Sequence, residues 1–149
     1  AFQVDHGGEQ LAAYGYRIDY DGHSVVLSGD TTYNENLISH AQNADLLVHE
    51  VTHGMGEGME QANLERIRRN HTIPEDAGKV FSRTKPKLAA YTHILLFGGA
   101  TSDDLIPATR GTYDGPLIVG EDLMQFTIGD EVEVTQIPVG PGPNDVGSF

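Results

Sequence analysis

The chain has 149 residues, 22 of them acidic and nine basic, with a formal charge of −13 and no cysteine. This length suits one domain with a real core, and the missing thiols exclude disulfides and thiolate metal sites, so any metal must bind to His, Asp or Glu. The acidic excess repels polyphosphates, which makes nucleic acid an unlikely partner on charge alone.

A β-hairpin, a short helix and a buried strand are predicted first along the chain. The runs Tyr14–Tyr20 and His23–Ser28 are rich in β-formers and flank Asp21-Gly22. Two such runs joined by Asp-Gly are the strongest short hairpin signal. Asn34 then suits the N-cap of a short amphipathic helix. The continuous apolar run in Asp45–Val51 predicts a strand that is buried on both faces.

Two helices are predicted on either side of His71. The first covers Glu60–Arg69, after a glycine-rich loop. The second begins with Thr72 as N-cap, Pro74 in the first turn and Glu75 as the partner in a capping box. Its apolar stripe consists of Ala77, Val80 and Phe81.

The rest of the chain returns to strands. Leu88–Leu95 predicts a strand and Asp103–Thr109 a helix, and three short strands follow, at Pro116–Val119, Met124–Ile128 and Glu131–Ile137. We therefore expect one domain over residues 1–137 and a Pro/Gly-rich tail over 138–149. Strands that alternate with helices predict an α/β fold with its site in loops at strand ends.

Imidazoles and carboxylates occupy those strand ends. His6, Asp30, Glu50 and His93 each follow or close an apolar run. Zinc, or a similar ion such as Mn²⁺ or Fe²⁺, accepts both ligand types. Asp30, in a tight Ser-Gly-Asp-Thr turn, is suited to bridging two ions, which His6 and His93 would each complete. Glu50 and His71 lack the context of ligands and suit a proton-donating pair.

A different metal chemistry is also open, because His49-Glu50 and His53 match the HExxH signature of zinc proteases. That interpretation requires a helix through residues 46–54. In a strand, residues four apart are about 13 Å apart, too far to bind one ion. The preceding apolar run favours the strand.

The chain resembles metallo-β-lactamase-fold hydrolases, in particular the ribonuclease Z and arylsulfatase-like branch, over roughly residues 3–135. The resemblance rests on the runs VDHG, YGYRIDYDGHSVVLSGDT, ADLLVHEV, HTIPEDAGKVF and KPKLAAYTH. It implies the C-terminal half of an αββα sandwich, with one mixed sheet and helices on one face. It makes His6 and His93 metal ligands, Asp30 the bridging ligand of two zinc ions, and Glu50 with His71 the pair that assists proton transfer.

The sequence departs from the family pattern in two places. The H-x-H-x-D-H motif, which supplies much of the dinuclear site, does not occur in the chain, and Ile94-Leu95-Leu96-Phe97 follows His93 in place of the serine and Arg-Tyr typical of ribonuclease Z. With the acidic charge, this favours a hydrolase of small esters, lactones or phosphodiesters, incomplete as this chain, over a nuclease.

A non-catalytic half-domain that acts as a binding or assembly module is the alternative. A single sheet layer leaves an apolar face open, so we expect a homodimer or an N-terminal segment to cover the face that carries VVL and LLV. No apolar run reaches the roughly 20 residues that cross a membrane, and AFQVDHGGEQ lacks the features of a signal peptide. We therefore expect a cytoplasmic protein.

Overall fold

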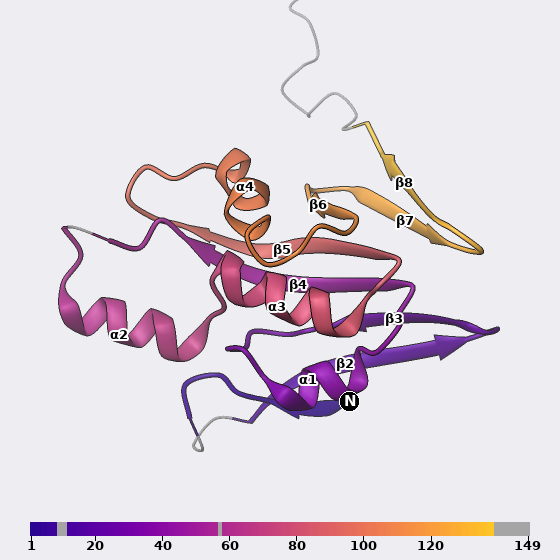
Figure 1. Ribbon diagram of the computed structural model, residues 1–149, viewed down its shortest axis with the longest axis horizontal. Helices are drawn as coiled ribbons and strands as arrows, with labels where there is room; N and C mark the ends of the chain where they lie inside the picture. The colour runs from indigo at the N-terminus through magenta and orange to yellow at the C-terminus, as the bar shows by residue number, and fades with distance from the viewer. Residues whose placement is uncertain (9–11, 57, 139–149) are drawn as a thin grey trace, which may run out of the picture.

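A six-stranded mixed sheet organises the computed structural model, which describes residues 1–8, 12–56 and 58–138. The strands lie side by side in chain order, antiparallel from β1 to β3 and parallel from β3 to β6 (Figure 1). They are β1 (Phe2–Val4), β2 (Ala13–Tyr20), β3 (His23–Leu27), β4 (Leu46–His53), β5 (Leu88–Leu96) and β6 (Leu117–Val119). A separate hairpin follows, formed by β7 (Met124–Ile128) and β8 (Val132–Gln136).

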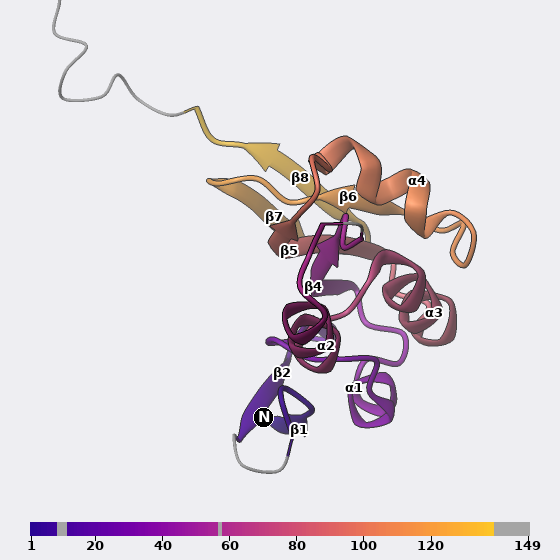
Figure 2. The ribbon, with the colours of Figure 1, turned by 90° about the vertical axis from the view of Figure 1, so that its left-hand side faces the viewer.

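Helices cover one face of the sheet, and the hairpin covers part of the other (Figure 2). The helices are α1 (Glu35–His40), α2 (Gln61–Asn70), α3 (Pro74–Thr84) and α4 (Leu105–Thr109), the last preceded by a 3₁₀ turn at Ser102–Asp104. The α/β class with helices on one face of a mixed sheet is confirmed. The predicted tail lies outside the described residues from 139 onward, so the boundary at 137 stays a prediction.

Local signals placed several elements correctly. Asp21 (φ 48°) and Gly22 (φ 81°) form the two-residue turn between β2 and β3, with the two positive φ angles of a type I′ hairpin. The Asn34 side chain accepts a hydrogen bond from Leu37 N at 3.0 Å, as an N-cap does.

The predicted start of α3 is wrong. The N-cap is Ile73, and it makes no side-chain cap bond. Thr72 instead donates its hydroxyl to Thr31 O and its backbone N–H to Glu50. These long-range bonds compete with the local cap and prevail because they join two loops at a buried site.

The core has two parts, one on each face of β4. Leu47 and Val51 pack with α1, α3 and α4, whereas Leu46 packs with Phe126 and Ile128 of the β7–β8 hairpin. The strand is therefore buried on both faces, as predicted. Because the hairpin covers this region, the exposed part of the open face is carried mainly by β2, where Tyr20 is 82% exposed. Among the described residues no helix is long and apolar enough to cross a membrane.

Candidate metal centre

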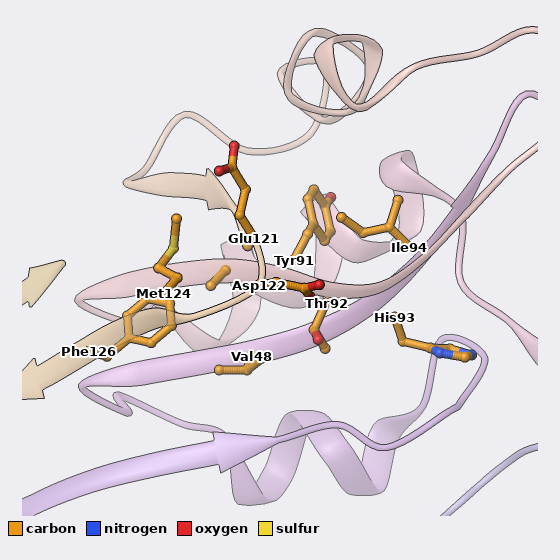
Figure 3. Close-up of a pocket in the computed structure, with 11 residues that line it drawn as sticks. Val48, Tyr91, Thr92, His93, Ile94, Glu121, Asp122, Met124 and Phe126 are labelled. Carbon is orange, nitrogen blue, oxygen red and sulfur yellow. The ribbon is translucent and has the colours of Figure 1, made fainter. Parts of the chain in front are cut away.

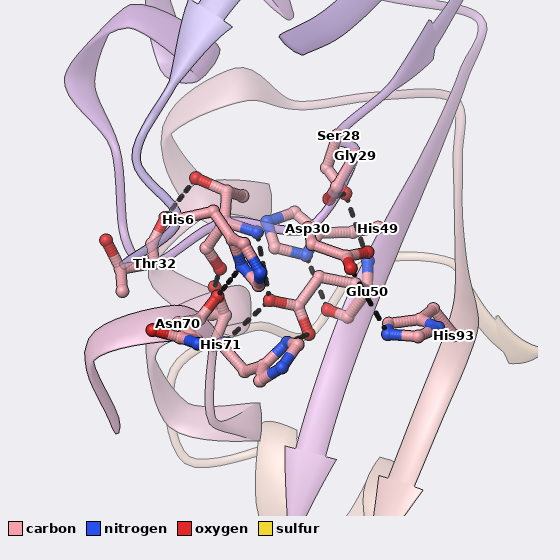
Figure 4. Close-up of polar contacts among 12 residues, drawn as sticks. His6, Ser28, Gly29, Asp30, Thr32, His49, Glu50, Asn70, His71 and His93 are labelled. Carbon is pink, nitrogen blue, oxygen red and sulfur yellow. Dashed lines mark hydrogen bonds and ion pairs between the residues drawn. The ribbon is translucent and has the colours of Figure 1, made fainter. Parts of the chain in front are cut away.

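One edge of the sheet gathers all five predicted site residues (Figure 4). The parallel strands β3, β4 and β5 place Asp30, Glu50 and His93 at or near their carboxyl ends. His6 follows β1 and His71 follows α2, and both side chains point into the same cluster. Side chains up to 87 positions apart in the chain thus share one small volume.

His6, Asp30 and His71 form the tightest group. Each offers a ligand atom, and these atoms all lie within 4.8 Å of one another. The set contains imidazole nitrogens and a carboxylate oxygen, the donors that zinc, Mn²⁺ and Fe²⁺ accept. The residues present therefore fit a divalent metal ion, and His71 lies within the group although the sequence assigned it to proton transfer.

A protein oxygen atom lies behind each imidazole of this group, and only that behind His6 makes a hydrogen bond among the described residues. His6 Nδ1 lies 2.7 Å from Asn70 O, and since a carbonyl only accepts, Nδ1 carries the proton and Nε2 keeps its lone pair. His71 Nδ1 lies 3.4 Å from Glu50 Oε2. A carbonyl or carboxylate behind the ring is the arrangement that fixes metal-binding histidines elsewhere.

His93 approaches from the other side of Asp30. Its Nε2 lies 3.4 Å from Asp30 Oδ2, and its ring lies 5.7 Å from that of His71. In the β4–β5 ladder, Glu50 pairs with Thr92 and Val51 with Ile94, so His93 is the extra residue of a β-bulge, with φ 41°. Bulges re-aim side chains, and the strained positive φ of a non-glycine residue is typical of functional sites.

Gly29 permits the tight turn that presents Asp30. Its φ is +62°, and a Cβ at this position would lie 2.4 Å from Tyr14 O. Any larger residue would therefore push the Asp30 loop away from β2. The glycine of the SGDT run is thus required by both its conformation and its surroundings.

Glu50 joins the loops that carry the other residues. Its Oε1 accepts hydrogen bonds from Thr31 N at 3.2 Å and Thr72 N at 2.9 Å. Its backbone N–H donates to Ser28 Oγ at 3.1 Å, which ties β4 to the end of β3. Among the described residues Oε2 has no hydrogen-bond partner, although the side chain is only 1% exposed. Glu50 is thus a buried link between the Asp30 and His71 loops.

Burial shifts the protonation of this pair toward the neutral forms. Desolvation raises the pKa of Glu50 to about 8, against the two backbone N–H groups that lower it, and the Asp30 charge adds to the rise. Desolvation also lowers the pKa of His71, with the neighbouring His6 as the next cause and Arg66 among the smaller ones.

These shifts predict how the stability of the metal-free chain depends on pH. Folded Glu50 keeps a proton that the unfolded chain loses near its ordinary pKa of 4.5, so its contribution is complete below that value and is lost as pH rises toward 8. The contributions of His49 and His71, whose pKa values are lowered, change only below about pH 6.5. We expect the free energy of unfolding to fall by about 1–2 kcal/mol between pH 6.5 and 8. Urea unfolding across this window measures it, and a flat profile, or the same slope in Glu50→Gln, would contradict it.

His49 has a structural role that its HExxH context did not predict. Its side chain is fully buried, its ring packs edge-on against Phe81, and Nδ1 donates to Glu50 O at 2.6 Å, where the ladder register shifts. Desolvation lowers the pKa of His49 to about 4, so the ring is neutral. Because residues 46–53 form a strand, the HExxH protease interpretation is wrong.

Two hollows open on the sheet face beside these residues. One, of about 270 Å³, is lined by Asp30, Glu50 and His93 among others. The second, of about 460 Å³, lies between β5 and the segment before β7, with Glu121 and Asp122 at its wall (Figure 3). Val48, Thr92 and His93 line both hollows, so the two lie next to each other on this face of the sheet.

Comparison with known proteins decides the family. The profile described as "Beta-lactamase superfamily domain" matches residues 1–94, more than half of the chain. The chain belongs to the beta-lactamase superfamily. The superfamily match spans His6, Asp30, Glu50, His71 and His93, which is the whole cluster.

Relatives in this superfamily carry the name ribonuclease Z. The enzyme of Haloarcula marismortui is 30% identical over 105 residues, which are 70% of this chain and 32% of that protein. That of Haloferax volcanii is 30% identical over 127 residues, 85% of this chain and 36% of the relative. The chain thus spans about a third of the length of these relatives.

Solved structures confirm the metallo-β-lactamase fold. The metallo-beta-lactamase fold protein YhfI of Bacillus subtilis superposes with a TM-score of 0.63 at 21% identity, over 80% of this chain and 45% of YhfI. The short form of human tRNase Z gives a TM-score of 0.50 at 18% identity, over 93% of this chain and 41% of the enzyme. At these identities the similarity shows the fold alone.

The expectation that nucleic acid is an unlikely partner is wrong. It rested on net charge, whereas the relatives that match most of this chain are named as ribonucleases. Net charge is a sum over the whole molecule, and a polyanion responds to the local potential at the site.

Proposed function

We propose that this chain carries part of the RNA-cleaving metal centre of a ribonuclease Z-like hydrolase, in which His6, Asp30 and His93 hold zinc. The observation that supports it is the convergence of these three side chains at one sheet edge. His93 Nε2 lies 3.4 Å from Asp30 Oδ2, and His6 offers a ligand atom within 4.8 Å of one on Asp30. RNA is preferred over small esters or lactones because the relatives are named ribonuclease Z.

Each proposed ligand has a role that follows from its position. His6 presents Nε2 because Asn70 O holds its Nδ1 proton. Asp30 lies between His6 and His93 and has two oxygens, so it can serve both sides as a bridge. When bound, the metal supplies a Lewis acid and lowers the pKa of water.

Glu50 and His71 assist proton transfer and lie behind the proposed ligands. The two side chains face each other at 3.4 Å, with Glu50 inside the protein and His71 toward the open site. Burial raises the pKa of Glu50 to about 8 and lowers that of His71, so at neutral pH the proton lies on Glu50 and the neutral His71 ring can accept one. A proton taken up or delivered by His71 can thus be balanced at Glu50.

Metal analysis of the purified chain tests the proposal. We expect zinc to co-purify with the wild-type chain or bind on addition, and Asp30→Ala to lose most of it because the variant lacks the bridging carboxylate. Asp103→Ala, which removes an exposed acid far along the chain, is the matched control. Because the chain contains no H-x-H-x-D-H motif, zinc-loaded wild type should then cleave RNA only slowly, and a chelator should stop this cleavage. Unchanged zinc content in Asp30→Ala would reject the site, and zinc binding without cleavage would reject the activity.

A further inference from the structure

The carboxyl end of α2 contacts the loop that carries His6. His6 Nδ1 donates to Asn70 O at 2.7 Å, and Gly7 N donates to Arg69 O at 3.1 Å. The last two residues of the helix therefore contact the loop that carries His6 into the candidate metal site, as Figure 4 shows for Asn70 and His6. Side chains on the outside of this helix end lie next to the site.

This helix end holds the densest positive charge of the chain. Arg66, Arg68 and Arg69 are three of the nine basic residues, and all three are exposed. Within the described residues, their side chains make no ion pair or hydrogen bond, whereas Arg17, Lys79, Arg83 and Lys87 each pair with an acid. In a chain of charge −13, three arginines without an acidic partner, on the helix that contacts the candidate metal site, require an explanation.

The helix dipole explains only part of this arrangement. Cations in the last turn of a helix are stabilising, by about 0.3–1 kcal/mol each, and Arg68 and Arg69 lie in that turn. Arg66 lies before the last turn, so the dipole does not account for it. Arg66 and Arg69 are three positions apart and share one side of the helix.

Arg68 points to a different place. It lines a hollow with His53 and Glu75, on the side of α2 that faces β4 and α3. Arg66 instead lies on the side of Asn70, four positions on, and a Cβ on Gly7 of the His6 loop would lie 3.0 Å from Asn70 Oδ1. The helix therefore separates the arginines into a pair beside the site and one residue away from it.

We propose that Arg66 and Arg69 bind backbone phosphates of an RNA strand and hold it against the metal centre. The inference rests on the proposed function for the choice of RNA. An acidic protein repels a polyanion over most of its surface, so two exposed guanidiniums on the helix end that contacts the His6 loop favour docking of the strand there. Guanidinium is the side chain best matched to phosphate, through paired N–H donors.

Binding of a short single-stranded RNA to the full chain tests this, by fluorescence anisotropy in a chelating buffer across a salt series. Working without metal separates this result from the zinc and cleavage tests of the proposed function. The test variant is Arg66→Ala/Arg69→Ala, and the control is Arg68→Ala/Lys79→Ala. Each removes two positive charges, so both change the formal charge from −13 to −15.

We expect the test variant to bind about tenfold more weakly at low salt. The slope of log K against log salt concentration should become smaller in magnitude by about 1.4, because two single-strand phosphate contacts contribute about 0.7 each. The control should keep at least half of the wild-type affinity and the same slope. Circular dichroism checks that both variants fold. Equal losses of affinity in both variants would show a nonspecific charge effect and overturn the proposal. Failure of the wild-type chain to bind RNA at about 20–50 mM salt, where phosphate contacts are strong, would also overturn it.

Discussion

Glu50→Ala is expected to lower the free energy of unfolding of the metal-free chain by about 3–5 kcal/mol. The substitution leaves Thr31 N and Thr72 N, both buried, without the oxygen that accepts from them. A buried donor without a partner costs about 1–3 kcal/mol, and the cavity left by the side chain adds to it. Urea unfolding at pH 7 measures the loss.

Glu50→Gln is the matched control because it keeps an oxygen for both N–H groups and resembles the protonated acid that the raised pKa of Glu50 favours. We expect it to stay within about 1 kcal/mol of wild type. If Glu50→Ala and Glu50→Gln lowered the free energy of unfolding equally, the charge of Glu50, and not its hydrogen bonds to the two loops, would stabilise this part of the fold. If both were harmless, the loops would not depend on Glu50 at all.

His71→Ala is expected to keep the wild-type zinc content, whereas His93→Ala loses most of it. This follows from the proposed roles, in which His93 holds the ion and His71 exchanges protons with Glu50. The structure makes the test necessary, because His71 lies within 4.8 Å of the ligand atoms of His6 and Asp30. Zinc per chain, measured by mass spectrometry after dialysis, gives the answer.

His53→Ala is the control for this pair, because it removes an imidazole from the end of β4, outside the cluster. The ring ¹⁵N shifts of His71 give an independent readout, since a nitrogen that binds zinc shifts when the ion is added. Zinc loss in His71→Ala as large as in Asp30→Ala would make His71 a ligand and would leave proton transfer to Glu50 alone.

Much of the fold followed from short-range signals. Asp21-Gly22 set the hairpin because both residues must take positive φ, and Asn34 set the start of α1 through a bond three residues away. The apolar run of β4 indicated burial on both faces, which the β7–β8 hairpin and the helices provide. These features depend on neighbours in the chain, so a single sequence can carry them.

The features that escaped prediction depend on partners far along the chain. Thr72 resembles an N-cap locally, but its N–H and hydroxyl are used by Glu50 and by Thr31, 41 positions earlier. The bulge at His93 exists only in the pairing of β5 with β4. His49 resembled a metal ligand in the HExxH pattern, whereas its buried position under Phe81 makes it a support for the bulged ladder.

The expectation from net charge failed for a related reason. The value of −13 sums the whole chain, whereas three of the nine basic residues lie within four positions at one end of α2. That end supports His6, so the local potential beside the cluster differs from the molecular average. A count of charges gives the average, and only the fold shows where each charge lies.

Anomalous X-ray scattering at the zinc edge, from crystals of the zinc-soaked chain, shows directly whether zinc binds beside Asp30. We expect a peak about 2.0–2.2 Å from His6 Nε2 and from a carboxylate oxygen of Asp30, or from Asp30 and His93 Nε2 on its other side. A zinc peak elsewhere on the chain, with none beside Asp30, would contradict it.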